Sequence, residues 1–183
     1  PGAITWKLGG PPLAQHHDPR PLPNGNLLIF DNGPHRRDHP APYSRVIEVN
    51  PRTSEIVWEY HDQSLFDFFT PYISGAQRLA NGNTLICEGC DGRIFEVTSA
   101  GTIVWEYVSP FFGTNNPLNN RIFRAYRVPY DWVPQLARPQ ADALGANIGD
   151  FIFLYGGHDD AGPVGAVVVA SIVLPAAEAL PET

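Results

Sequence analysis

The sequence LPNGNLLI at residues 22–29 is written a second time as LANGNTLI at residues 79–86. Two further pairs of blocks follow in the same order, namely RVIEV and RIFEV at residues 45–49 and 93–97, and IVWEY at residues 56–60 and 103–107. Three aligned blocks in one order identify a tandem repeat. Such repeats are typical of architectures in which similar units pack side by side.

Each copy predicts a series of short strands. An Asn-Gly pair between apolar runs favours a type I′ turn, so Asn24-Gly25 and Asn81-Gly82 are expected to join two strands each. The blocks after the turns are short, rich in β-branched and aromatic residues and bounded by turn residues, as strands are. If an innermost strand precedes each turn, each copy is a four-stranded antiparallel meander. The strands expected after the turns are 26–30, 45–49, 55–60, 83–87, 93–97 and 102–107.

The repeat length indicates a β-propeller. Trp58 and Trp105 recur at an interval of roughly 50 residues, which fits one four-stranded blade. We therefore expect an all-β chain, a β-propeller fragment of two complete four-stranded blades with partial blades on either side. The blades are expected at residues 13–60 and 72–107, with a third starting near residue 120.

The domain boundaries follow from this repeat. Residues 1–135 are expected to form the partial propeller, and residues 136–183 a C-terminal tail whose strands would close it. Two strands are predicted within the tail, at residues 151–155 and 164–173. Residues 2–6 resemble the closing strand of a preceding blade. Because neighbouring blades bury each other's faces, a partial ring also predicts an uncovered apolar face and self-association.

Composition excludes some classes of partner. The chain has 12 basic and 19 acidic residues and a net charge of −7, whereas a nucleic-acid partner would need a basic surface. The apolar stretch at residues 161–174 is about half as long as a membrane-spanning helix, so no span is expected. A chain that lacks methionine and begins with Pro1 is expected to be part of a longer protein.

The two cysteines form a Cys-x-x-Cys motif on a predicted hairpin. Cys87 and Cys90 have no second pair of ligands elsewhere in the sequence, so we expect no metal site and no cofactor. A local disulfide is the alternative interpretation.

Five segments resemble the bacterial arylsulfotransferase-like propeller proteins. They are QHHD, LPNGN, FDNG, GAQRL and FRAYRVPY, at residues 15–18, 22–26, 30–33, 75–79 and 123–130. The resemblance covers roughly residues 1–135, and this part of the sequence is similar to the C-terminal half of such a chain. It implies a six-bladed propeller with a site in the central channel, and sulfuryl transfer from an aryl sulfate to a phenol through a transiently sulfated histidine. It also implies a periplasmic or secreted location.

The family resemblance and the chemistry together make His17 the candidate catalytic residue. A neutral imidazole is a good nucleophile near neutral pH, and His17 lies where a predicted innermost strand enters the channel. Asp18 is the candidate orienting residue, and His16 is a candidate substrate-binding residue. Alternatively, His17 and Asp18 tie loops together between blades.

Three arginines are candidate ligands of the sulfate oxygens, because a planar guanidinium suits that geometry. Arg78 and Arg124 lie on predicted inner strands and are expected to converge with His17. Arg36 lies on the long connection at residues 31–43, a kind of loop that tends to carry function. The structural alternatives are an ion pair between blades for Arg78 and a solvated strand face for Arg124.

The second copy departs from the first at the candidate histidine. Counted back from Asn81 as His17 is from Asn24, the equivalent position is Ser74, and no histidine follows His61 until His158. The alternative function is therefore a non-catalytic propeller that acts as a ligand-binding or protein-interaction scaffold. A quinoprotein-like dehydrogenase ranks last, because the sequence offers no acidic cluster for its calcium ion.

Overall fold

The computed structural model of the chain is all-β, which confirms the predicted fold class. It describes residues 2–4, 6–8, 13–113, 119–129, 132, 150–156 and 170–171. Within these ranges there is no α-helix, and the 3₁₀ turn η1 covers Gly89–Asp91. The described part of the chain thus has no helix of the length and hydropathy needed to cross a bilayer.

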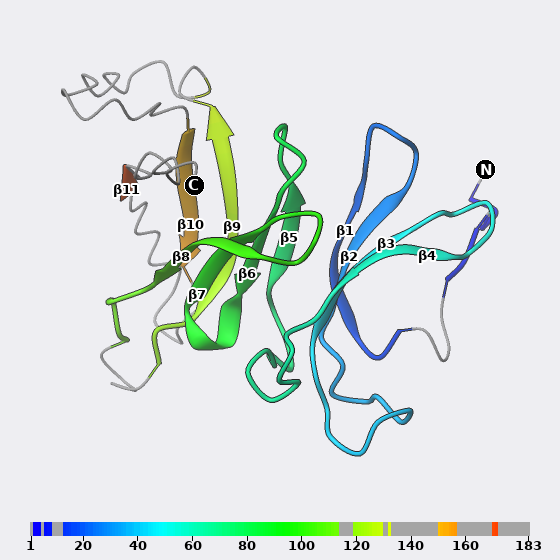
Figure 1. Ribbon diagram of the computed structural model, residues 1–183, viewed down its shortest axis with the longest axis horizontal. Coiled ribbons are helices and arrows are strands. Elements are labelled where there is room, and N and C mark those ends of the chain that lie inside the picture. Colours follow the sequence, from blue (N-terminus) through cyan, green and yellow to red (C-terminus); the bar gives the residue numbers. More distant parts are fainter. Residues whose placement is uncertain are drawn as a thin grey trace, which may run out of the picture.

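Two four-stranded antiparallel sheets reproduce the predicted meander twice, each with its strands in chain order (Figure 1). The first sheet consists of β1 (His16–Pro21), β2 (Leu27–Asp31), β3 (Arg45–Val49) and β4 (Ile56–Tyr60). The second consists of β5 (Gly75–Arg78), β6 (Thr84–Glu88), β7 (Arg93–Val97) and β8 (Ile103–Val108). Every strand bound predicted after the turns lies within one residue of the observed bound.

The hairpin turns differ from the predicted type I′. Gly25 and Gly82 have positive φ (85° and 88°), whereas the asparagines before them do not. The Gly25 amide donates to the carbonyl of Leu22 (2.9 Å). The type I′ prediction was wrong because the loop has three residues, 23–25, between the paired Leu22 and Asn26, and this length favours a type I turn followed by a left-handed glycine. Oδ1 of Asn24 accepts the Asn26 amide within this loop (3.0 Å).

A third sheet has the order β11-β10-β9, with β9 (Ile122–Pro129), β10 (Asp150–Gly156) and β11 (Ala170–Ser171). β10 confirms the strand predicted at residues 151–155, and β9 begins close to residue 120, where a third unit was predicted to start. β11 falls within the predicted strand at 164–173, the rest of which lies outside the described residues. Residues 2–4 and 6–8, where the end of a preceding blade was predicted, form no strand.

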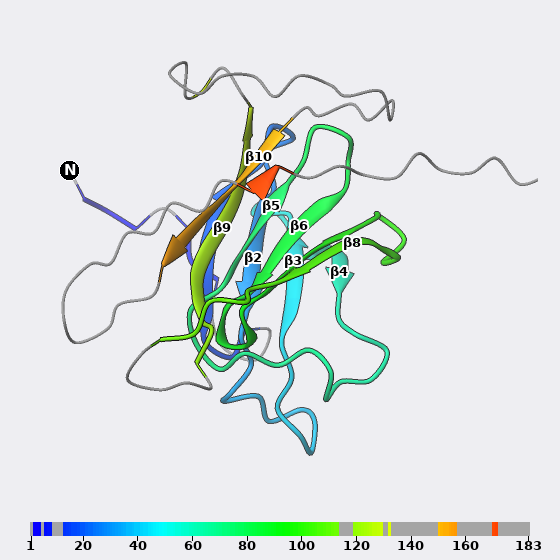
Figure 2. The same ribbon diagram turned by 90° about the vertical axis from the view of Figure 1, so that its left-hand side faces the viewer.

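The three sheets are stacked in chain order, as Figures 1 and 2 show. The core between the first two sheets consists of Leu28, Phe30, Val46, Tyr60, Phe68, Ala76, Ile86, Phe95 and Val97. The core between the second and third consists of Leu85, Cys87, Ile94, Ile122 and Ala125. Successive residues of β6 enter different cores, because side chains alternate between the faces of a strand. Stacking of this kind is required of consecutive blades, and the closed ring of a propeller remains a prediction.

The face of the first sheet that points away from the second sheet is covered. Ile29, Ile47 and Val49 are buried there, with Leu8 and Leu13 packed against them. This patch is therefore not the uncovered apolar face expected of a partial ring. Self-association remains a prediction.

A buried carboxylate joins the first sheet to the second at the hairpin end. Asn24 and Asn26 both donate from Nδ2 to Oε1 of Glu48 (2.9 and 2.7 Å). The other oxygen, Oε2, pairs with Nη2 of Arg78 on β5 (2.9 Å). The Arg78 guanidinium lies over the ring of Trp58, 4.5 Å from its centroid. We call this arrangement the carboxylate clamp.

The clamp recurs between the second and third sheets. Asn81 and Asn83 donate to Oε1 of Glu96 (3.2 and 2.6 Å), and Oε2 of Glu96 pairs with Arg127 of β9. Arg127 in turn lies over Trp105, 5.8 Å from its centroid. Burial alone would raise the pKa of Glu96, but the two amides and the Arg127 charge lower it below its ordinary value. The repeated asparagine, glutamate and tryptophan positions thus encode one joint between sheets.

We predict that Arg78→Ala lowers the free energy of unfolding by about 2 kcal/mol, because it removes a charged partner from a largely buried carboxylate. Because the clamp also lowers the pKa of Glu48, this contribution should be present above the ordinary pKa and lost as the pH falls below it. Denaturant titration of Arg78→Ala, Glu48→Gln and the double variant measures the coupling.

The exposed Arg52→Ala serves as the control and should change stability by less than about 0.5 kcal/mol. Additive effects of Arg78→Ala and Glu48→Gln would show that the two side chains do not act as a unit.

Candidate functional site

The candidate site lies where β1 and β9, the first strands of their sheets, approach either side of β5. β1 is irregular between His17 and Arg20, where Asp18 and Pro19 oppose one residue of β2. Asp18 has a φ of 52°, in the left-handed region that aspartate tolerates better than most residues. This bulge places the Asp18 side chain at the junction of the three sheets, where it is 5% exposed.

The Asp18 carboxylate binds three side chains, which with it form the Asp18 cluster. Arg20 Nε lies 3.2 Å from both of its oxygens. Arg124 Nη1 and Tyr126 Oη approach Oδ1 at 3.1 and 3.2 Å. The Arg20 guanidinium also lies over the Tyr126 ring, 4.0 Å from its centroid. Two guanidinium groups around one carboxylate leave an excess positive charge, and both arginine side chains are partly exposed.

Gly75 makes room for the Asp18 carboxylate. A Cβ at residue 75 would lie 2.4 Å from Asp18 Oδ2, closer than atoms can approach. Gly75 of β5 pairs with Cys87 of β6. His17 of β1 pairs with Phe30 of β2, which is the residue equivalent to Cys87 in the first copy of the repeat. By register, Gly75 therefore occupies the position of His17 in the second sheet. The equivalence predicted for residue 74 was wrong, because the bulge gives β1 one extra residue.

His17 is half-buried and has a defined partner. Its Nδ1 lies 2.6 Å from Oδ1 of Asn32, which follows directly after β2. Asn32 is fully buried, and its Nδ2 donates to the carbonyls of Thr70 (2.8 Å) and Ile73 (3.1 Å). The histidine is thus anchored to the point where two long connections, residues 32–44 and 61–74, meet.

Arg36 lies on the first of these connections and is buried. Its Nη2 pairs with Asp31 Oδ2 (2.7 Å), and its guanidinium lies over the Tyr43 ring, 4.3 Å from the centroid. Arg36 Nε and Nη1 are buried without a hydrogen-bond partner. Asp31 also accepts Arg45 Nε (3.0 Å) and the Ala14 amide (2.9 Å). Two buried nitrogens of Arg36 therefore carry N–H groups that could still donate a hydrogen bond.

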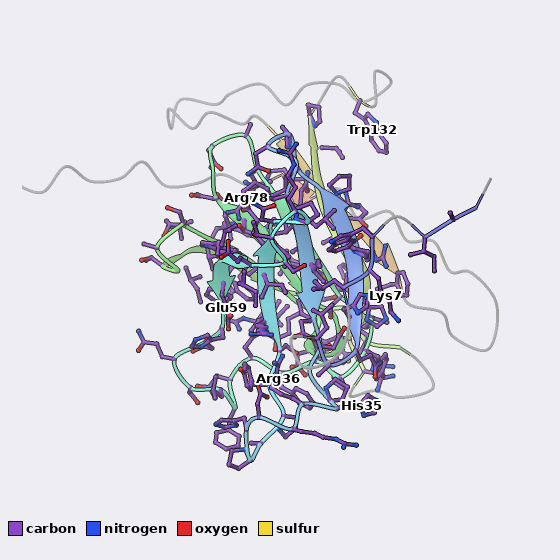
Figure 3. The ribbon with its side chains drawn as sticks, turned by 90° about the vertical axis from the view of Figure 1, so that its right-hand side faces the viewer. Lys7, His35, Arg36, Glu59, Arg78 and Trp132 are labelled. Carbon is purple, nitrogen blue, oxygen red and sulfur yellow. The ribbon has the colours of Figure 1, made fainter. Side chains whose placement is uncertain are left out.

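The structure brings some of the predicted residues together and separates others. Arg124 reaches Asp18, next to His17 in the chain. Arg78 belongs to the carboxylate clamp, and Figure 3 shows it at the opposite end of the sheets from Arg36. Arg78 lies three positions along β5 from Gly75, which corresponds to about 10 Å. His16 is exposed at the start of β1.

Three residues of the site were not predicted from the sequence. Tyr126 lies two positions from Arg124 on the regular part of β9, and i, i+2 spacing places side chains on one face of a strand. That spacing is the signal that could have found Tyr126. Arg20 lies across the bulge of β1 from Asp18, where this alternation is interrupted. Asn32 lies within the FDNG segment, but its contact with His17 depends on the pairing of β1 with β2.

The cysteines do not form the alternative disulfide. Cys87 and Cys90 are both free thiols, and burial raises the pKa of Cys87. Across residues 13–113 and the other described segments, no three histidine, cysteine, aspartate or glutamate side chains gather as metal ligands would.

Glu88, at the end of β6, is a further buried carboxylate. It accepts the Phe69 amide (3.1 Å) and pairs with Arg93 (3.1 Å), which also contacts Glu106. Burial outweighs the attraction of Arg93 and raises the pKa of Glu88 to about 7. This carboxylate, which is 2% exposed, therefore changes its charge near neutral pH.

The chain is similar in sequence to sulfotransferases. The family model described as arylsulfotransferase (ASST) matches residues 10–110. The arylsulfate sulfotransferase AssT of Escherichia coli is 35% identical over 82 residues, which cover 40% of this chain and 14% of that protein. This chain therefore spans a small part of that relative. A solved structure of a Bacteroides caccae protein of unknown function aligns with a TM-score of 0.43 and 17% identity, over 66% of this chain and 38% of that one.

We predict that Gly75→Ala destabilises the protein by about 1–3 kcal/mol, because the new methyl group overlaps the Asp18 carboxylate. Its cost should be smaller in an Asp18→Ala background, where the overlapping oxygen is absent. Gly113→Ala is the control, since a Cβ there would make an ordinary contact at 3.7 Å. Thermal denaturation of the four variants tests this, and an equal cost in both backgrounds would contradict it.

We predict that Glu88→Gln changes how stability depends on pH. A raised pKa means that the protonated carboxyl favours the folded state, so its contribution is complete below the ordinary pKa of 4.5 and is lost as the pH rises through about 7. The free energy of unfolding of the wild type should fall relative to Glu88→Gln across this window, by up to about 3 kcal/mol. Denaturant titrations at pH 5 and pH 8 measure the difference. The exposed Glu55→Gln should follow the wild type at both pH values.

Proposed function

This chain belongs to the arylsulfotransferase family, and we propose that the protein transfers a sulfuryl group from an aryl sulfate to a phenol, with His17 as the nucleophile. The observation that carries the proposal is a half-buried imidazole anchored by Asn32 on the residue that directly precedes Asp18, the centre of the Asp18 cluster. Transfer of an anionic group requires a nucleophile and nearby excess positive charge, and Arg20 and Arg124 supply that charge around the residue after His17.

The proposed reaction has two steps. A ring nitrogen of His17 donates its lone pair to the sulfur of the aryl sulfate, the bond from sulfur to the aryl oxygen breaks, and the phenolate leaves with that electron pair. A phenol oxygen then attacks the sulfur, the sulfur–nitrogen bond breaks, and its electron pair returns to the ring. The acceptor's proton is released as the new aryl sulfate forms, so the enzyme ends unchanged.

The surrounding side chains have distinct roles in this proposal. Arg20 and Arg124 hold the sulfuryl oxygens, where negative charge gathers in the transition state. Asp18 positions both guanidinium groups, and the Tyr126 ring, already stacked with Arg20, lines the site. His16 and Arg36 remain candidates for contacts with the substrate.

We also propose that the stacked sheets are consecutive blades of a β-propeller, with β1, β5 and β9 lining its channel. Contacts of β5 with both β1 and β9 support this arrangement. By family, the protein is proposed to act in the periplasm or outside the cell.

The test is sulfuryl transfer by the full-length protein from an aryl sulfate to a phenol. His17→Ala should lower kcat/KM at least about 1,000-fold, as loss of a nucleophile does. The wild type, quenched with donor alone, should carry one sulfuryl group on His17 by peptide mass spectrometry. His35→Ala, on an exposed loop position, is the matched control and should retain activity.

Unchanged turnover by His17→Ala would remove His17 from the mechanism. A wild type that is inert toward aryl sulfates but binds a protein or glycan partner would support the alternative, a non-catalytic scaffold. The glycine at the His17 position of the second sheet fits that alternative, because that sheet offers no second histidine there.

A further inference from the structure

We propose that Asn32 is a positioning residue that fixes His17 as the tautomer with its proton on Nδ1, and thereby leaves Nε2 as the nitrogen with a free lone pair. The catalytic meaning of this inference rests on the proposed function. The tautomer itself does not, because it can be measured without turnover.

The orientation of the Asn32 amide is dictated by its neighbours. Backbone carbonyls can only accept hydrogen bonds, so the end of the amide that faces Thr70 and Ile73 must be Nδ2. The other end, Oδ1, therefore faces His17 at 2.6 Å. Since an amide oxygen can only accept, the His17 Nδ1 must carry a hydrogen. A neutral imidazole has one N–H, so Nε2 is unprotonated.

The frame around Asn32 is rigid enough to hold this orientation. The backbone N–H of Asn32 donates to the Gln15 carbonyl (2.9 Å), and its backbone carbonyl accepts a hydrogen bond from Ser44 Oγ (2.8 Å). Ser44 Oγ also accepts the Thr70 amide (2.9 Å). Ile73 has a φ of 56°, a strained value for a β-branched residue, and in this conformation its carbonyl meets Asn32.

The hydrogen-bond partner of His17 is a neutral amide, although carboxylates are next to both residues in the sequence, since Asp18 follows His17 and Asp31 precedes Asn32. Asp18 is bound by the arginines of its cluster, and Asp31 by Arg36 and Arg45. A neutral acceptor orients the ring without favouring the imidazolium, as a carboxylate would. The Asn32 amide therefore fixes the ring orientation without adding a charge beside it.

The same feature suits the second half of the proposed reaction. After Nε2 has bonded to sulfur, the ring bears a positive charge and keeps the proton on Nδ1, because an amide oxygen cannot remove it. When the phenol oxygen attacks, the sulfur–nitrogen bond breaks and its electrons neutralise the ring. A cationic ring is the better leaving group, so Asn32 keeps the intermediate reactive.

The direct test is the ¹⁵N NMR spectrum of the His17 ring in the full-length protein at pH 8, assigned by its loss in His17→Gln. We expect an attached proton on Nδ1 and a bare Nε2, the reverse of the form that free histidine favours. Asn32→Ala should move the ring toward the Nε2–H form. Ser44→Ala loosens the same junction but leaves the His17 partner in place, so it should keep the Nδ1–H form. A wild type with its proton on Nε2, or an Asn32→Ala protein that keeps it on Nδ1, would overturn the inference.

A second arm uses the near-isosteric Asn32→Asp, which places a carboxylate beside His17. If the proposed function holds, the acidic limb of the kcat/KM profile should move up by about one pH unit or more, because the imidazolium becomes favoured. Ser44→Ala should leave the position of that limb unchanged. An unmoved limb in Asn32→Asp, with His17→Ala inactive, would refute the role of Asn32 while the proposed function stands. An inactive wild type with a clear Nδ1–H signal would refute the proposed function while the tautomer assignment stands.

Discussion

One buried carboxylate shared between two sheets is the interaction on which the rest of this structure depends. Glu48 collects both hairpin asparagines of its own sheet and one arginine of the next. Apolar packing alone would let stacked sheets slide, because the hydrophobic effect is non-directional. The clamp is directional, so it fixes the position of each sheet on its neighbour, and Glu96 repeats the same joint one sheet later.

This constraint has its consequence at the other end of the strands. Once the sheets are fixed, the first strands of three units lie together, and Asp18 can meet Arg124 across more than one hundred residues of sequence. The absence of a side chain at Gly75 provides the space between them. The hairpin end thus carries the repeated structural joint, and the loop end carries the residues that differ between the copies.

Membership of the arylsulfotransferase family gives that difference a chemical meaning. The copies share the clamp but not the site, since His17 has a glycine as its counterpart by register. A repeat can keep its joint and specialise one position, because the joint and the site occupy opposite ends of the same strands. In the role proposed above, Asn32 extends this specialisation by setting which nitrogen of the imidazole carries the free lone pair.

The sequence by itself determined the repeats and the strands after each turn to within one residue, because strand patterns and turn residues are local signals. It offered His17 and Asp18 only as candidate site residues, through the family resemblance. Only the tertiary structure decided where the arginines go. Arg78 and Arg124 both lie on first strands, yet one pairs with Glu48 and the other with Asp18. Their partners lie in other sheets, and the bulge in β1 shifts the register by one residue. Neither property is contained in local patterns, because both depend on how sheets pack.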